Sequence, residues 1–357
     1  MKVHKIALIP GDGIGIDITE AAVSVIQKLS TATKKFEVQF ETFDWSSESY
    51  KTHGLFMPPD AMERLKKFDA IFLGAVGVND VQEHLSIWGL RVHMRQELKQ
   101  FINIRPIRIL RGITSPLRTI DRMDLDWVVI GENSEGEYSG QGGVTHPKAA
   151  FGVATEVTIF TRHATERIFR FAFETAKARP RKKLTVVTKS NMQRWGMVFW
   201  DTIFTEIAKD YADVEADLMQ VDAMIERMTM DPHSLDTIVA TNLHSDVIAS
   251  LASTLSGSLG IACSSNLDPT RQNPSTFEPI MPSRPDLAGK GIANPIGAMW
   301  AAAEMLRWLG EQTAADHLLR CFENATEWGV KTRDLGGSSG TRDVTQSVVQ
   351  EIERTVR

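Results

Sequence analysis

Cysteine is scarce in this chain, which has two in 357 residues, Cys263 and Cys321. They show no C-x-x-C spacing and no accompanying histidine cluster, so the sequence indicates neither a zinc site nor a disulfide framework. A reducing, cytoplasmic location is therefore expected. Long apolar runs are lacking too, since the first one, residues 6–9, is far shorter than the roughly 20 residues of a membrane span. We expect no membrane segment.

An excess of basic charge is also lacking. Forty lysines and arginines stand against 45 acidic residues, and the formal net charge is -5. Interspersed charges of this balance give no continuous basic surface for a phosphate backbone, so nucleic acid is not an expected partner. The length exceeds one average domain but is short for three, which favours two lobes.

Apolar strands alternate with amphipathic helices along the chain. The first half predicts strands at 5–10, 38–43 and 70–73, with helices at 16–29 and 59–67 between them. The same alternation continues with strands at 127–130, 156–160, 184–188 and 237–240 and helices at 164–178, 191–210, 246–253 and 295–309. This order is typical of an α/β fold with a mostly parallel sheet covered by helices.

A glycine-rich turn, Gly11–Gly15, follows the first strand and opens the first helix. This position invites a dinucleotide-binding interpretation. The spacing is G-x-G-x-G, however, and no acidic residue stands at the roughly 20-residue offset of the Rossmann fingerprint. The sequence therefore favours a tight strand-to-helix turn, and not a Rossmann fold.

Two groups of polar residues suggest chemistry on an anionic substrate. Asp246 is the one carboxylate in the stretch 242–250, and together with Asp222 it suggests a site for Mg2+ or Mn2+ that lacks one ligand. Four arginines within eighteen residues could bind carboxylates in two-pronged geometry: Arg91, Arg95, Arg105 and Arg108. For Arg108 a solvated surface position is an equally good interpretation.

Five motifs occur in order over almost the full length: Ile9–Gly15, Arg95 with Arg105, Glu132–Ser139, Thr188–Asn191 and Gly291–Pro295. In these motifs the chain resembles the β-decarboxylating dehydrogenases, the isocitrate and isopropylmalate dehydrogenase family. Residues 43–45, 84–91, 137–143 and 178–182 resemble its tartrate and D-malate branch most closely. The resemblance implies an isopropylmalate dehydrogenase-like fold with two lobes on a mostly parallel central sheet.

The same resemblance implies a division of labour between the lobes. Residues 1–100 plus 255–357 would form a large, discontinuous domain on the cofactor side. Residues 101–254 would form a small domain carrying substrate, metal and dimer contacts. A homodimer with shared active sites is expected, because in the family a lysine and an aspartate reach in from the neighbouring subunit.

Residue roles also follow from the resemblance. Tyr138 would protonate carbon after loss of carbon dioxide, and Lys189, from the partner subunit, would accept the hydroxyl proton. The remaining roles are substrate binding by Arg91, Arg95 and Arg105, metal binding by Asp246 with Asp222 of the partner subunit, and cofactor binding by Asp286 at the ribose and Asn294 at the adenine.

The chain departs from the family pattern at two positions near the expected metal. Ser250 stands where the family has an aspartate one helical turn after Asp246, and Gly131 stands where it has an arginine. One carboxylate and one guanidinium are both absent, so the formal charge is kept while the pocket should gain volume. This combination predicts a substrate altered in shape or in its anionic group.

A third departure affects the loop that wraps the adenosine and phosphates in the family. Met281-Pro-Ser-Arg284 replaces His-Gly-Ser-Ala. Pro282 has no amide hydrogen to offer a phosphate and stiffens the loop, whereas Arg284 could attract a phosphate, including that of NADP. Asp286 and Asn294 remain, so NAD is expected with this loop as the open question.

Three functions are compatible with these residues. The first is metal-dependent oxidation of a tartrate- or malate-like 2-hydroxy acid by NAD, with or without decarboxylation. The alternative is an NAD-independent decarboxylase of a 3-oxo acid, including one with a non-carboxylate anionic group. The third is a catalytically inactive homologue, against which the retained Tyr138 and Lys189 argue.

Overall fold

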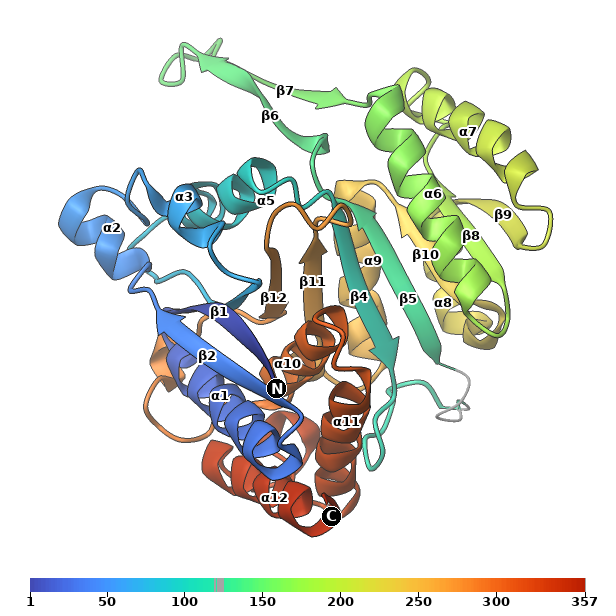
Figure 1. Ribbon diagram of the computed structural model, residues 1–357. Helices are drawn as coiled ribbons and strands as arrows, with labels where there is room; N and C mark the ends of the chain where they lie inside the picture. Colours follow the sequence, from blue (N-terminus) through green and yellow to red (C-terminus); the bar gives the residue numbers. More distant parts are fainter. Residues whose placement is uncertain (119, 121–124, 357) are drawn as a thin grey trace. The chain divides into compact units, whose positions relative to one another are not determined.

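The computed structural model describes residues 1–118, 120 and 125–356, and the chain divides into two compact units. Unit 1 comprises Met1–Gln100, Ile109–Arg118 and Ser253–Arg357, and unit 2 comprises Phe101–Arg108 and Thr119–Ala252. Residues 109–118 and 253–254, which the sequence-based division gave to the small domain, thus belong to unit 1. Each unit has its own strands and helices (Figure 1).

Unit 1 is built on five strands in the order β2-β1-β3-β12-β11. Neighbouring strands are parallel except for the antiparallel pair β11 and β12. The strands are β1 (Lys2–Gly11), β2 (Phe36–Thr42), β3 (Ala70–Ala75), β11 (Cys263–Leu267) and β12 (Ser275–Pro279). All residues of β3 are buried, as expected for a strand covered on both faces.

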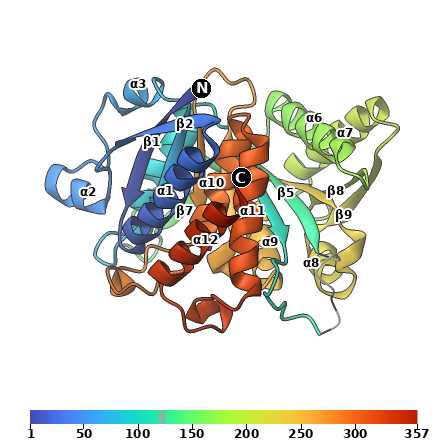
Figure 2. The ribbon, with the colours of Figure 1, turned by 60° about the horizontal axis from the view of Figure 1, so that its bottom comes forward.

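Four long helices of unit 1 pack together beside this sheet, and Figure 2 shows α1, α11 and α12 side by side. They are α1 (Ile14–Thr33), α10 (Ile296–Trp308), α11 (Gln312–Glu327) and α12 (Thr341–Thr355). Ile14, Ile18 and Ile26 lie on the buried stripe of α1, at the spacing of one helix face. The shorter helices are α2 (Ser47–His53), α3 (Ala61–Leu65), α4 (Glu83–Ser86), a π-helical turn (Ile87–Val92) and α5 (His93–Glu97).

Unit 2 also contains five strands in one sheet, in the order β4-β5-β10-β8-β9. β4 is antiparallel to β5, and the other neighbours are parallel. The strands are β4 (Ile102–Arg108), β5 (Asp126–Glu132), β8 (Lys183–Thr188), β9 (Glu215–Gln220) and β10 (Thr237–Ala240). The helices are α6 (Arg162–Ala178), α7 (Gly196–Ile207), α8 (Val221–Met230) and α9 (Asn242–Leu255). Phe169 and Trp200, on α6 and α7, are fully buried with ring centroids 4.4 Å apart.

An isolated antiparallel ribbon, β6 (Gly136–Thr145) with β7 (Val153–Ile159), extends from unit 2 (Figure 1). Four large apolar side chains of this arm are exposed: Val144, Phe151, Val153 and Val157. A two-stranded ribbon is at best marginally stable in water when it stands alone. The arm therefore has the character of a surface that packs against something else.

Two details differ from the sequence-based prediction. The helix expected at 191–210 begins only at Gly196, because residues 189–193 form a turn in which the amides of Met192 and Gln193 donate to the carbonyl of Lys189. The predicted strand at 156–160 is β7, whose partner β6 the periodicity did not reveal. In the described part of the chain, no helix has both the length and the apolar character needed to cross a membrane.

Candidate active site

The candidate residues of unit 2 gather at one edge of its sheet. β5, β8, β9 and β10 are mutually parallel, so their carboxyl ends meet at the same edge. Gly131 lies at the end of β5, Lys189 follows β8, Asp222 follows β9, and Asp246 lies in α9 after β10. In open α/β sheets, ligands bind outside the carboxyl ends of the strands. This edge is accordingly the candidate active site.

Arg105 and Asp246 meet at this site. The Nη2 atom of Arg105, on β4, donates to Asp246 Oδ1 at 2.6 Å, and its Nε donates to Asn103 Oδ1 at 3.1 Å. The arginine side chain is 10% exposed and the aspartate side chain 48% exposed. The sequence-predicted substrate arginine and the first predicted metal ligand are thus brought together, with one carboxylate edge accessible.

Arg108, in contrast, lies at the other end of β4. In the antiparallel register Arg108 is opposite Asp126, where β5 begins, whereas Ile102 is opposite Glu132, where β5 ends. The candidate site lies at the end of β5. A role for Arg108 outside this site is the interpretation that the register favours.

Lys189 and Asp222 form a second ion pair at the same edge. Lys189 Nζ donates to Asp222 Oδ1 at 2.8 Å, and this hydrogen bond holds the pKa of the Asp222 carboxyl below its usual value. Asp222 and Asp246 therefore each face a cationic side chain of the same unit. Among the described residues, no group of three or more His, Cys, Asp or Glu side chains is placed to hold a metal ion.

The two carboxylates nevertheless have the right chemistry for a hard cation. Mg2+ and Mn2+ take oxygen ligands and keep open positions for substrate. Asp246 is accessible and Asp222 is two-thirds exposed. The donor atoms fit such a cation, while the described part of one chain supplies no complete ligand set.

Tyr138 lies near the start of the arm, on β6, and is partly buried. Its neighbour Glu137 fixes the start of the arm against α9, because its carboxylate accepts from Thr241 Oγ1 at 2.8 Å and from the amide of Leu243 at 3.2 Å. Sequence reasoning missed Glu137. Its position beside Tyr138 was the one signal that could have drawn attention to it.

His244 is a further titratable group that the sequence did not single out. It is buried on the first turn of α9, and burial lowers its pKa. The charge of Lys189 lowers this pKa further, whereas the charge of Glu137 raises it. Its side chain therefore lies within electrostatic range of both residues. A histidine on an otherwise apolar face is more often a core residue than a functional one, so no sequence pattern pointed to His244.

Gly131 is tightly packed against Ser245. A Cβ atom added to Gly131 would lie 2.2 Å from Ser245 Oγ and 2.8 Å from Ser245 Cβ. The serine hydroxyl donates to the carbonyl of Asn242 at 2.9 Å, which holds it there. The expectation that the pocket gains volume where the family has an arginine is therefore wrong at Gly131 itself, because Ser245 fills the adjoining space.

Ser250 lies one helical turn after Asp246, as the sequence predicts. Its hydroxyl donates to the main-chain carbonyl of Asp246 at 2.9 Å. This bond back to the preceding turn is common for serine in helices. The serine thus contacts its own helix at the position where the family places a carboxylate.

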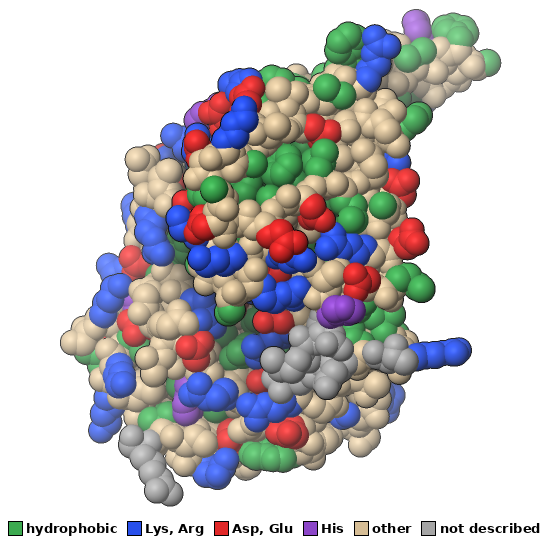
Figure 3. All heavy atoms as spheres, turned by 90° about the vertical axis from the view of Figure 1, so that its right-hand side faces the viewer, with side chains coloured by type: hydrophobic (Ala, Val, Ile, Leu, Met, Phe, Trp, Pro, Cys, Tyr) green, Lys and Arg blue, Asp and Glu red, His purple; other side chains and the backbone are tan. Residues whose placement is uncertain are grey.

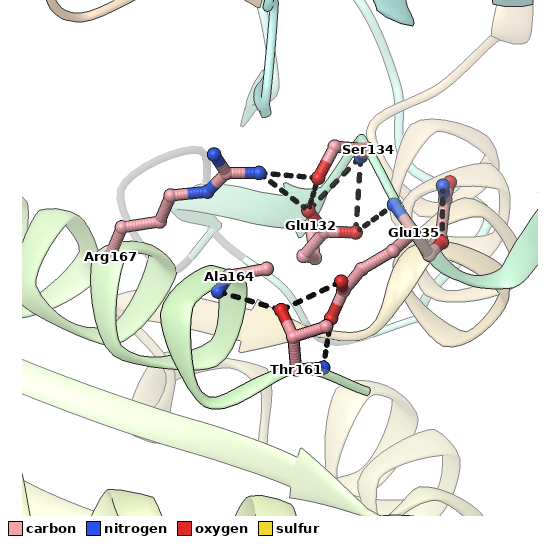
Figure 4. Close-up of polar contacts among 7 residues, drawn as sticks. Glu132, Ser134, Glu135, Thr161, Ala164 and Arg167 are labelled. Carbon is pink, nitrogen blue, oxygen red and sulfur yellow. Dashed lines mark hydrogen bonds and ion pairs between the residues drawn. The ribbon is translucent and has the colours of Figure 1, made fainter. Parts of the chain in front are cut away.

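A buried carboxylate organises the connection from β5 to the arm (Figure 4). Glu132 is 3% exposed and accepts from the Ser134 hydroxyl, from the Ser134 amide and, at 2.8 Å, from the Glu135 amide. Arg167 lies 3.7 Å from its Oε1 atom. Burial raises the pKa of Glu132 although these hydrogen bonds oppose the shift. These contacts of Glu132 therefore hold the connection between β5 and the arm in place.

Glu135 ties the same connection to α6. Its carboxylate accepts from the amide of Thr161 at 2.6 Å and from the Thr161 hydroxyl at 2.9 Å. That hydroxyl in turn accepts from the amide of Ala164 at 3.1 Å and caps the helix. Figure 4 shows the chain of contacts from Glu135 through Thr161 to the start of α6. The base of the arm is thus fixed on two sides.

In unit 1, Arg91 and Arg95 converge on one buried carboxylate. Arg91 Nε lies 3.2 Å from Glu278 Oε2, and Arg95 Nη2 donates to Glu278 Oε1 at 3.1 Å. Burial raises the pKa of Glu278, but the two guanidinium groups outweigh this effect and hold it below its usual value. Glu278, on β12, was not identified from the sequence, since a lone strand glutamate carries no spacing signal.

The glycine turn packs closely against neighbouring backbone. Gly11 and Gly13 have φ of 74° and 57°, and an added Cβ would lie 2.1 Å from the carbonyl oxygens of Ala75 and Ser283 respectively. The amide of Ile14 donates to the Ser283 carbonyl at 2.7 Å. The glycines thus allow a close backbone approach at the start of α1, as the tight-turn interpretation predicts.

The predicted cofactor residues of unit 1 already have partners within the unit. Arg284 donates to both carboxylate oxygens of Asp286, at 2.9 and 2.8 Å, and holds the pKa of that carboxyl below its usual value. Asn294 is buried, donates to Asp334 at 2.8 Å and accepts from the Ile296 amide. Asp286 is half-exposed, and its carboxylate could accept hydrogen bonds from the two hydroxyls of a ribose, so it fits the nucleoside end of NAD. Arg284 would compete with the ribose for this carboxylate.

The chain matches the family model for isocitrate/isopropylmalate dehydrogenase over residues 5–352. It belongs to the isocitrate/isopropylmalate dehydrogenase family. The sequence-based assignment of family and fold is therefore confirmed.

Three relatives cover nearly the whole length. A probable tartrate dehydrogenase/decarboxylase, TtuC, of Agrobacterium vitis is 54% identical over 99% of this chain and 97% of its own. D-malate dehydrogenase (decarboxylating) of Escherichia coli (strain K12) is 40% identical over 99% of this chain and its full length. The crystal structure of isocitrate dehydrogenase from Methylococcus capsulatus matches with a TM-score of 0.88 and 32% identity, over 98% of this chain and 99% of that one.

Proposed function

We propose that this enzyme oxidises a tartrate- or malate-like 2-hydroxy acid with NAD and promotes decarboxylation of the product. The observation that carries the proposal is the meeting of Arg105 and Asp246 at the carboxyl edge of unit 2, in a family member whose relatives are named for these reactions. Oxidation places a carbonyl β to the second carboxylate, which can then leave as carbon dioxide.

The residues of the chain divide the proton transfers between them. Lys189 would accept the proton of the substrate hydroxyl, and Tyr138 would donate a proton to carbon after carbon dioxide has left. Arg91, Arg95 and Arg105 would bind the substrate carboxylates. When bound, NAD would accept the hydride, and a divalent cation held by Asp246 and Asp222 would offset negative charge on the substrate oxygen. Asp286 would hold the ribose and Asn294 the adenine.

The ion pair of Lys189 with Asp222 favours an assembly of two chains. A charged ammonium paired with a carboxylate cannot act as a base, because it has only donors to offer. We propose that a second copy of the chain completes the site, so that Lys189 and Asp222 exchange partners across the dimer. A cytoplasmic location remains a prediction, and neither nucleic acid nor a membrane is proposed as a partner.

Exposed apolar side chains near α7 and α8 support the dimer. Figure 3, which faces this side of unit 2, shows hydrophobic side chains grouped among charged ones. The exposed apolar residues are Val198 on α7, Ile225 and Met230 on α8, Leu218 on β9, and Met192 and Trp195 in the turn before α7. Exposed apolar patches of this kind commonly mark interaction surfaces. The apolar arm is a second element that a partner chain could cover.

Matched arginine variants test the proposed activity. The assay follows NADH formation and carbon dioxide release with D-malate and the tartrate isomers in the presence of Mg2+ or Mn2+. Arg105→Gln should lower kcat/KM by about 10- to 100-fold, since hydrogen bonds to charged groups contribute about 1.5–3 kcal/mol. Arg108→Gln, at the other end of the same strand, should stay within about threefold of the parent. Equal losses in both variants would contradict this location of the site.

The Arg284–Asp286 pair favours one second candidate, an NAD-independent decarboxylase of a 3-oxo acid. The carboxylate that would hold the cofactor ribose is already bound by a guanidinium of the same loop. Carbon dioxide release from oxaloacetate without NAD, together with no calorimetric binding of NAD or NADP, would replace the first proposal by this one. If a metal-loaded dimer shows neither dehydrogenase nor decarboxylase activity, the inactive homologue is the interpretation that remains.

A further inference from the structure

Glu278 is a buried acid placed between two of the proposed substrate arginines. Its side chain is 5% exposed, and Asn266 Nδ2 donates to its Oε1 atom at 2.8 Å. Arg91 and Arg95 approach its two carboxylate oxygens separately, at 3.2 and 3.1 Å. A buried carboxylate is costly unless cations and hydrogen bonds compensate it, and here both are present.

The local backbone presents both arginines to this one strand residue. Arg91 lies in the π-helical turn Ile87–Val92 and Arg95 lies four residues later in α5, so both side chains occur on one face of a continuous helical segment. π-helical turns are rare and frequent at functional sites. The side chains of Arg91 and Arg95 remain 22% and 18% exposed. The pair is therefore anchored by Glu278 while part of each side chain stays accessible.

Glu278 lowers the positive charge that the two arginines present to an anion. Its carboxylate offsets one unit of that charge, because it pairs with both guanidinium groups. A pair whose charge is offset in this way suits a singly charged carboxylate, whereas the same pair without Glu278 would favour a dianionic phosphate or phosphonate.

We infer that Glu278 is a specificity-determining residue, which makes the Arg91–Arg95 pair select a carboxylate over a dianionic group. The inference rests on the proposed function, because it assumes that these arginines bind one end of the substrate. It adds to that function a preference for substrates whose anionic group at this end is a carboxylate. A residue outside the sequence motifs thereby sets which organic acids are accepted.

A charge-swap cycle tests the inference by binding alone. Calorimetry measures the dissociation constants of succinate and 3-phosphonopropionate, which differ only in one terminal anionic group. The variants are Glu278→Gln, Arg91→Met and the double variant, which has the same net charge as the parent because it lacks one charge of each sign. Glu278→Gln should shift the preference toward the phosphonate by about tenfold, and the double variant should return it to within about threefold of the parent. Arg91→Met should weaken both ligands and leave the carboxylate preferred.

The cycle separates charge selection from a purely structural role. If Glu278 only supported the fold, the double variant would bind no better than Glu278→Gln, and that result would overturn the inference. An unchanged preference in Glu278→Gln would overturn it as well. Should Glu278→Gln fail to fold, a shift of Arg91→Met toward the phosphonate would contradict the inference. Failure of the parent to bind either anion would overturn the proposed function together with it.

Discussion

Gly131 offers a sharp test of packing at the candidate site. In Gly131→Ala the new methyl group would lie 2.2 Å from Ser245 Oγ and 2.8 Å from its Cβ, whereas carbon atoms in contact normally lie about 3.5–4.0 Å apart. Ser245 would have to move and give up its 2.9 Å hydrogen bond to Asn242. Overpacking costs about 1–3 kcal/mol and a lost hydrogen bond about 1 kcal/mol, so we expect a loss of about 2–4 kcal/mol.

Urea unfolding monitored by tryptophan fluorescence measures this loss as a lower transition midpoint. Ser245→Gly removes the obstructing side chain, so the double variant Gly131→Ala/Ser245→Gly should recover most of the stability lost by Gly131→Ala. Ser245→Gly alone serves as the control for the serine. The reasoning is refuted if Gly131→Ala is as stable as the parent, or if removing the serine side chain gives no recovery beyond additivity.

Three further predictions follow from other contacts. Arg284→Ala should strengthen calorimetric NAD binding by about two- to fivefold, because it frees the carboxylate of Asp286 from a surface ion pair; weaker binding would show that the guanidinium itself contacts the cofactor. Burial raises the pKa of the Cys321 thiol from 9.0 to about 11. The folded state therefore keeps this proton better than the unfolded state, so the stabilisation is complete below pH 9 and declines as the pH rises toward 11. A urea midpoint that falls equally in Cys321→Ala over this range would contradict it. Trp195→Glu should lower the molar mass seen in light scattering and abolish activity, whereas Trp328→Glu, at an exposed tryptophan of unit 1, should do neither; full activity of a proven monomer would exclude shared active sites.

Much of the fold could be predicted because the spacing of apolar residues indicates which side chains of a helix or strand are buried. The strand at 70–73 and the helix at 164–178 are continuous in their pattern, and both occur as β3 and α6. β6 could not be found this way, since a glycine-rich, mostly exposed strand lacks alternation between a core face and a solvent face. The late start of α7 likewise depends on a local turn at Lys189 and not on propensity.

The sequence indicated which residues belong to the candidate site, but it did not indicate which of them contact one another. Motifs identified Arg105, Lys189 and Asp246, and the structure places all three in unit 2, at or near one edge of its sheet. That Arg105 binds Asp246, and that Gly131 leaves its space to Ser245, depends on three-dimensional proximity that spacing does not encode.

The discontinuity of unit 1 has a consequence for the nascent chain. β3 pairs with β12, yet about 200 residues of sequence separate the two strands. At synthesis rates of roughly 5–20 residues per second, β3 lacks its neighbour β12 for about 10–40 seconds after it has been made. Unpaired apolar strands are prone to aggregate during such an interval. The yield of folded protein should therefore depend on chaperones that shield β3 until β12 has been made.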